Sequence, residues 1–144
     1  MKNFLKRPLL LITLCITLAV SFDSCIVKFT PTYDAQIHQD ASSCAEHMDA
    51  LYTEMILSTN KNFSSYTEGY ANVQAELNAL KLKAESRPMG KTLLKILLII
   101  DQNFTKYKTV HQTNGRLTTG ELVIYLDYLK SLWHPYLAAD NSLK

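Results

Sequence analysis

The sequence predicts an all-α protein, an antiparallel up-and-down four-helix bundle that follows an N-terminal signal peptide. In four consecutive segments, apolar residues recur at steps of three and four, which is the spacing of one helix face. Short polar turns separate these segments, and short turns join antiparallel neighbours. Residues 93–100 carry seven apolar side chains around Lys95, so we expect a helix that its partners cover on nearly all sides.

The first residues have the layout of a secretory signal peptide. Lys2, Lys6 and Arg7 supply positive charge, and the apolar run over residues 9–20 follows them. This run is too short to cross a bilayer, which takes about 20 apolar residues. We therefore expect residues 1–24 to be removed on export.

Cys25 ends the tetrapeptide Phe22-Asp23-Ser24-Cys25, which resembles a relaxed lipobox of Gram-negative bacterial lipoprotein precursors. The resemblance implies that the Cys25 sulfur takes a diacylglyceryl group and that the new amino terminus is acylated after cleavage. It also implies a cell-envelope location, at the outer membrane rather than the inner, because Ile26 and not Asp follows the cysteine. The alternative is cleavage after Ser21, which gives a periplasmic or secreted protein whose Cys25 is free to pair with Cys44.

The mature chain is predicted to form one domain behind a short tether. The 144 residues are 47% hydrophobic, enough for one compact core. Residues 25–32 form the lipidated cysteine and the tether, and the seven residues after Cys25 span at most about 25 Å. The bundle is expected over residues 33–137, with a flexible tail over residues 138–144.

The first two helical segments have regular apolar stripes. We expect the first to begin after Pro31, with Thr32 as its N-cap. Its stripe contains Tyr33, Ile37, Ala41, Cys44, Met48, Leu51 and Met55. The second stripe contains Phe63, Tyr66, Tyr70, Val73, Leu77, Leu80 and Ala84.

The last two segments are bounded by turn signals. The third runs from about Met89 to His111, and Asn114-Gly115 then indicates a turn. The fourth opens with Thr118 and Glu121, the spacing of a capping box. Pro135 lacks a backbone N–H and disfavours helix at the residue before it, so we expect the helix to stop or kink there.

Charge and motifs argue against several functional classes. Without residues 1–24 the chain has 12 basic and 12 acidic side chains, which disfavours nucleic-acid binding. Gly90-Lys91-Thr92 lacks the first glycine of a phosphate-binding loop, because Glu85 stands at that position. The histidines do not form the Glu-x-x-His pairs of di-iron bundles. We predict no enzyme activity, no metal and no cofactor.

Two alternatives use buried side chains. A secreted bundle could hold a small hydrophobic or haem-like ligand in its core, with Met48 or Met55 and His111 as ligands to the iron. The favoured reading is that the methionines fill the core and the histidines are exposed. Cys44 lies in the first apolar stripe, so it is expected to be a small buried hydrophobe rather than a catalytic thiol.

The aromatic residues of the fourth segment suggest an interaction surface. Aromatic side chains with a polar group are enriched at interfaces. We predict such a surface at Tyr128, Trp133 and Tyr136, with Tyr128 and Tyr136 exposed. The expected function is that of a non-catalytic, membrane-anchored binding or structural module with an envelope protein as its partner.

Overall fold

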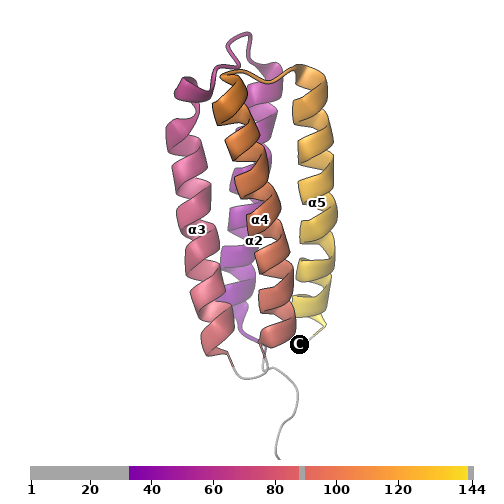
Figure 1. Cartoon of the computed structure of the whole chain (residues 1–144). Coiled ribbons are helices and arrows are strands. Elements are labelled where there is room, and N and C mark those ends of the chain that lie inside the picture. The colour runs from indigo at the N-terminus through magenta and orange to yellow at the C-terminus, as the bar shows by residue number, and fades with distance from the viewer. Residues whose placement is uncertain (1–32, 88–89, 143–144) are drawn as a thin grey trace, which may run out of the picture.

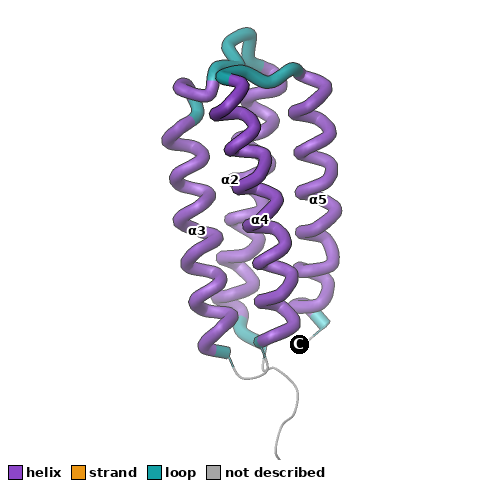
Figure 2. Tube along the Cα trace, viewed as in Figure 1, coloured by secondary structure: helices purple, strands orange, loops and turns teal. Residues whose placement is uncertain are grey.

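Four helices run up and down along one long axis in the computed structural model, which describes residues 33–87 and 90–142 (Figure 1). They are α2 (Ala35–Leu57), α3 (Thr67–Ser86), α4 (Lys91–Asn114) and α5 (Thr119–Asn141). One 3₁₀ turn, η1 (Phe63–Ser65), precedes α3. The described residues contain no β-strand, only an isolated bridge between Asn62 and Arg116 (Figure 2). The predicted all-α four-helix bundle is confirmed.

Each helix packs against two others. α2 and α4 both contact α3 and α5, so the four helices form a closed ring around a central core. The start of α2 and the end of α5 therefore lie at the same end of the bundle as the end of α3 and the start of α4 (Figure 1). No helix in the described part of the chain is long and apolar enough to span a membrane.

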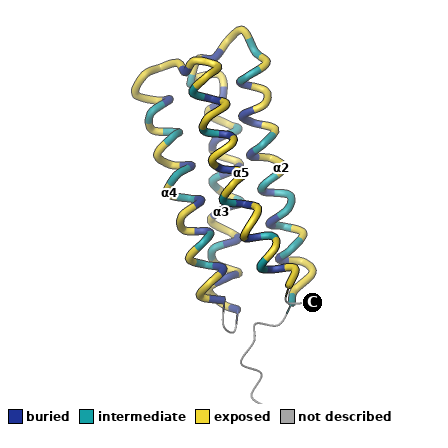
Figure 3. Tube along the Cα trace, turned by 90° about the vertical axis from the view of Figure 1, so that its right-hand side faces the viewer, coloured by how far each residue is buried: buried dark blue, intermediate teal, exposed yellow. Residues whose placement is uncertain are grey.

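Most residues of the predicted stripes form this core, except that Tyr33 and Phe63 are only half-buried. Buried positions recur along every helix (Figure 3). Leu97, Ile100 and Phe104 of α4 are fully buried. The expectation that residues 93–100 are covered on nearly all sides is wrong at Leu98 and Ile99, which are 41% and 45% exposed. In a ring of four helices each member has only two neighbours, so one face of α4 stays open.

Capping residues mark where the helices begin and end. Asp34, not Thr32, is the N-cap of α2, and its carboxylate accepts hydrogen bonds from the backbone N–H groups of Gln36 and Ile37. Thr118 and Glu121 form the predicted capping box of α5. Gly115 ends α4 in the left-handed conformation with φ of 71°, which a glycine adopts without steric cost.

A stop or a kink was predicted at Pro135; the stop is wrong, because α5 continues to Asn141. Residues 138–141, assigned to a flexible tail, belong to this helix. A proline inside a helix costs about 3 kcal/mol. Two gains beyond it offset that cost: Tyr136 is fully buried, and Asp140 makes buried contacts with residues of two other helices or their ends.

Asp140 joins three parts of the chain at this end of the bundle. Its Oδ1 accepts a hydrogen bond from Arg87 Nη1 at 2.8 Å, and its Oδ2 accepts one from His38 Nδ1 at 2.9 Å. The carboxylate is completely buried and the Arg87 side chain is 4% exposed. The contact ties the last turn of α5 to the start of α2 and to the residue that follows α3.

Several predictions fall on residues 1–32, which lie outside the described residues. They are the signal peptide over residues 1–24, the lipidated Cys25 and the tether, and they stay predictions. The same holds for residues 143–144 of the expected tail.

Candidate functional site

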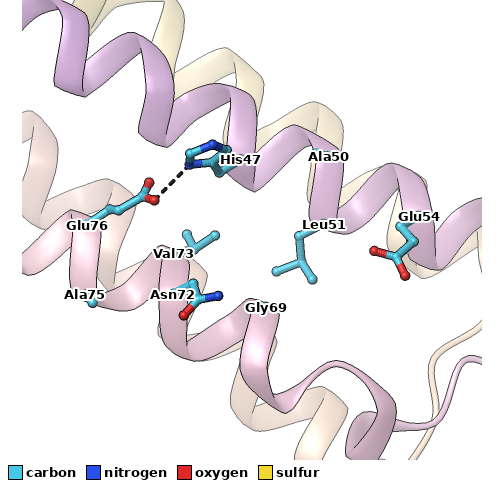
Figure 4. Close-up of a pocket in the computed structure, with 9 residues that line it drawn as sticks. All are labelled: His47, Ala50, Leu51, Glu54, Gly69, Asn72, Val73, Ala75 and Glu76. Carbon is cyan, nitrogen blue, oxygen red and sulfur yellow. Dashed lines mark hydrogen bonds and ion pairs between the residues drawn. The ribbon is translucent and has the colours of Figure 1, made fainter.

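A groove with a volume of about 530 Å³ lies between α2 and α3 (Figure 4). Small residues on both helices leave it open, and the buried side chains of Leu51 and Val73 lie between the helices at its base. The residues that line it are His47, Ala50, Leu51, Glu54, Gly69, Asn72, Val73, Ala75 and Glu76.

Gly69 lets the two helices approach each other beside the groove. A Cβ atom at this position would lie 2.6 Å from Cδ1 of Leu51, well inside van der Waals contact. Glycine weakens a helix by about 1 kcal/mol relative to alanine. Here it provides the space that Leu51 occupies against α3, which explains a residue that the apolar stripe alone did not require.

Carboxylates give the groove a negative charge. Glu76 of α3 accepts a hydrogen bond at Oε1 from Nδ1 of His47 on α2, at 2.8 Å (Figure 4). Glu54 is exposed, and no ion pair joins it to a described residue. The groove therefore combines an apolar base with an acidic rim when His47 is neutral.

The structure separates the three residues of the predicted aromatic surface. Tyr128 is 43% exposed, whereas Trp133 and Tyr136 are buried in the core. The exposure predicted for Tyr136 is wrong because α5 does not stop at Pro135. Once the helix continues, Tyr136 follows the same spacing of three and four that places Leu126, Leu129 and Trp133 inside, and extending the stripe would have found it.

Tyr128 belongs to a different aromatic group from the predicted one. Tyr107 of α4 stacks on Tyr125 of α5 with ring centroids 4.0 Å apart, and Tyr128 contacts Tyr107 edge-on. This group joins α4 to α5. The sequence could not pair Tyr107 with Tyr125 because the partner lies on another helix.

Trp133 has a packing role and lies at the edge of a second groove. Its indole N–H donates to the sulfur of Met48 at 3.3 Å, which links α5 to α2. The second groove, of about 430 Å³, lies between these two helices. Its lining comprises Ser42, Ala45, Glu46, Asp49, Lys130, Trp133, His134 and Leu137.

His111 is fully buried, so the expectation that the histidines are exposed is wrong for this residue. Its Nε2–H donates to the carbonyl of Lys61 at 2.9 Å, and its Nδ1 accepts from the Tyr70 hydroxyl at 3.0 Å. These partners fix the neutral tautomer, because a carbonyl only accepts and the other nitrogen is left to accept from the hydroxyl. A haem iron bound through His111 would have to break one of these bonds.

Acid should weaken the bundle through His111. Burial lowers the pKa of His111 in the folded protein, so the unfolded chain binds the proton more strongly. The contribution of neutral His111 to the free energy of unfolding is complete above the ordinary histidine pKa of about 6.5, and it is lost as the pH falls below that value. We expect wild type to lose stability relative to His111→Gln between pH 7.5 and pH 5.5, by at most about 1.4 kcal/mol per pH unit for one proton. Urea unfolding at several pH values measures this difference, and parallel curves for both proteins would contradict it.

Cys44 is buried, as predicted. Burial above all, with the negative charge of Glu76 nearby, raises the pKa of the Cys44 thiol far above neutral. A thiol in this environment stays protonated and is a poor nucleophile.

Comparison of the chain with protein-family models, with curated proteins and with solved structures found no match. In the described part of the chain, no three His, Cys, Asp or Glu side chains gather in a way that could hold a metal ion.

Proposed function

We propose that this protein is a lipid-anchored lipoprotein of the bacterial cell envelope whose bundle binds a partner protein through the α2–α3 groove without catalysing a reaction. The observation that carries the proposal is this groove, which has an apolar base, an acidic rim and walls of small residues. The proposed location rests on the resemblance of Phe22-Asp23-Ser24-Cys25 to a lipobox. Ile26 after the cysteine favours the outer membrane over the inner.

The position of the groove suits a protein held at a membrane by its N-terminus. A tether of seven residues spans at most about 25 Å, so the end of the bundle where α2 begins would stay near the lipid surface. Glu54 lies 19 residues beyond the start of α2, or about 28 Å further along the helix axis. The groove would thus open sideways, away from the membrane and toward other envelope proteins.

The surroundings of Cys44 support a binding role over catalysis by this thiol. Its raised pKa keeps the sulfur protonated, and the side chain has no exposed surface through which a substrate could reach it. In this proposal the carboxylates of Glu54 and Glu76 attract the partner protein by their charge.

Fatty-acid labelling tests the anchor. In the producing bacterium, a clickable fatty acid should label the wild-type chain and hold it in the membrane fraction. Cys25→Ser should lose the label, because only a thiol accepts the diacylglyceryl group. Cys15→Ser is the matched control and should keep the label, since residue 15 lies in the predicted signal peptide. An unlabelled wild-type chain would remove the anchor from the proposal.

The alternative is a secreted bundle with a small hydrophobic or haem-like ligand in its core. It is less well supported, because both ring nitrogens of His111 and the sulfur of Met48 already have partners. A Soret band in the purified protein would favour it.

A further inference from the structure

We infer that the α2–α3 groove docks an amphipathic helix of the partner protein, with basic residues spaced seven apart on the face that enters the groove. This inference rests on the proposed function and names the chemistry of its partner. Its basis is the length of the groove, the size of the side chains along it and its charge.

The groove is longer than the hollow in Figure 4. A second hollow continues it toward the start of α2 and shares Glu76 with the first. Its lining is Asp40, Ser43, Glu76, Ala79, Leu80 and Lys83. Together the two hollows extend from Asp40 to Glu54 along α2, about 21 Å at 1.5 Å per residue. A helix of about 14 residues has this length.

Both walls follow the repeat of a helix-packing surface. Residues 40, 47 and 54 of α2 are seven apart, and residues 69, 76 and 83 of α3 have the same spacing. Position 69 is a glycine, and between the heptad positions the walls carry mainly small side chains, namely Ser43, Ala50, Ala75 and Ala79. A heptad spacing with small side chains lets another helix approach closely along the groove.

An extended peptide suits this groove less well than a helix. A bound strand obtains its affinity from backbone hydrogen bonds to a free sheet edge. The groove walls are formed by the middle turns of α2 and α3, where the backbone N–H and carbonyl groups are hydrogen-bonded within each helix. No free backbone groups remain there to pair with a strand. A bound helix satisfies its own backbone groups and needs only side-chain contacts.

The charge of the walls selects a basic partner. Asp40, Glu54 and Glu76 line the groove against one lysine, Lys83, which is paired with Asp40. With His47 neutral the net charge is −2, and α2 contains no lysine or arginine. Glu54 and the His47–Glu76 pair lie two turns apart, about 10.5 Å along the axis. Two cationic side chains seven residues apart on a docked helix would match these positions, whereas anionic lipid headgroups would be repelled.

Site-specific photocrosslinking in the full chain tests the inference in the producing bacterium. A benzophenone amino acid replaces Ala50 or Ala75, both exposed on the groove walls, or Ile124 as a control on α5. We expect Ala50 and Ala75 to give an adduct with the same protein and Ile124 to give none. The crosslinked peptide should be a helical segment with Lys or Arg at positions seven apart.

A charge reversal tests the role of the rim. Glu54→Lys combined with Glu76→Lys should reduce the adduct about tenfold. The matched control is Glu46→Lys combined with Glu68→Lys, which makes the same charge change on the same two helices outside the groove and should leave the yield unchanged. Equal yields in the two double variants would overturn the inference.

The outcomes distinguish this inference from the proposed function. An adduct at both groove positions with an acidic or extended segment, or with a second copy of this chain, overturns the basic-helix inference and leaves a binding groove. Adducts with lipid alone, or no adduct at Ala50 and Ala75, overturn both.

Discussion

Asp140→Asn is expected to lower the free energy of unfolding by about 3–5 kcal/mol, the cost of removing one partner from a buried ion pair. The substitution keeps the size of the side chain but removes the negative charge that faces Arg87 and His38. The Arg87 guanidinium, whose side chain is 4% exposed, would then stay buried without its carboxylate. Equilibrium urea unfolding followed by helical circular dichroism measures the loss.

Asp127→Asn on the same helix is the matched control, because Asp127 is exposed and its replacement should change stability by less than about 0.5 kcal/mol. The double variant Arg87→Met with Asp140→Leu removes both charges and should recover most of the loss. A loss below about 1 kcal/mol for Asp140→Asn would show that the contact at the end of α5 contributes little.

Leu97→Ala is expected to destabilise the bundle by about 2–5 kcal/mol. Leu97 is fully buried in the N-terminal half of α4, so its truncation removes apolar contacts and leaves a cavity that the surrounding helices fill only in part. The same urea unfolding experiment measures this change, and the dependence on urea concentration should keep its slope if unfolding stays two-state.

Leu98→Ala is the control in the next position. Leu98 is 41% exposed and borders solvent on the open face of α4, so its truncation should cost less than about 1 kcal/mol. Similar losses for the two variants would contradict the orientation of α4, because neighbouring residues on a helix point about 100° apart.

The candidate site was harder to predict than the fold. No pattern in the sequence indicates that Glu54 and Glu76 line the same groove. A groove arises where the flanks of two helices meet, and the residues of each flank are far apart in sequence: His47 and Glu76 are 29 positions apart. Apolar periodicity reports which face of a helix is buried, but it does not report which flank meets which neighbour.

The predicted aromatic surface failed for a related reason. Pro135 was expected to end or kink α5, since a proline costs a helix about 3 kcal/mol. Propensity is a weak guide where tertiary contacts are strong. The burial of Tyr136 and the contacts of Asp140 with Arg87 and His38 keep the helix intact to Asn141.

By itself, the sequence determined the number of helices, most of their buried faces and the turns at Gly115 and Thr118, because these depend on the spacing and caps of neighbouring residues. The tertiary structure alone decided the groove between α2 and α3, the partners of His111 and the extent of α5. Each of these depends on side chains that lie far apart in the chain and meet only when the helices pack.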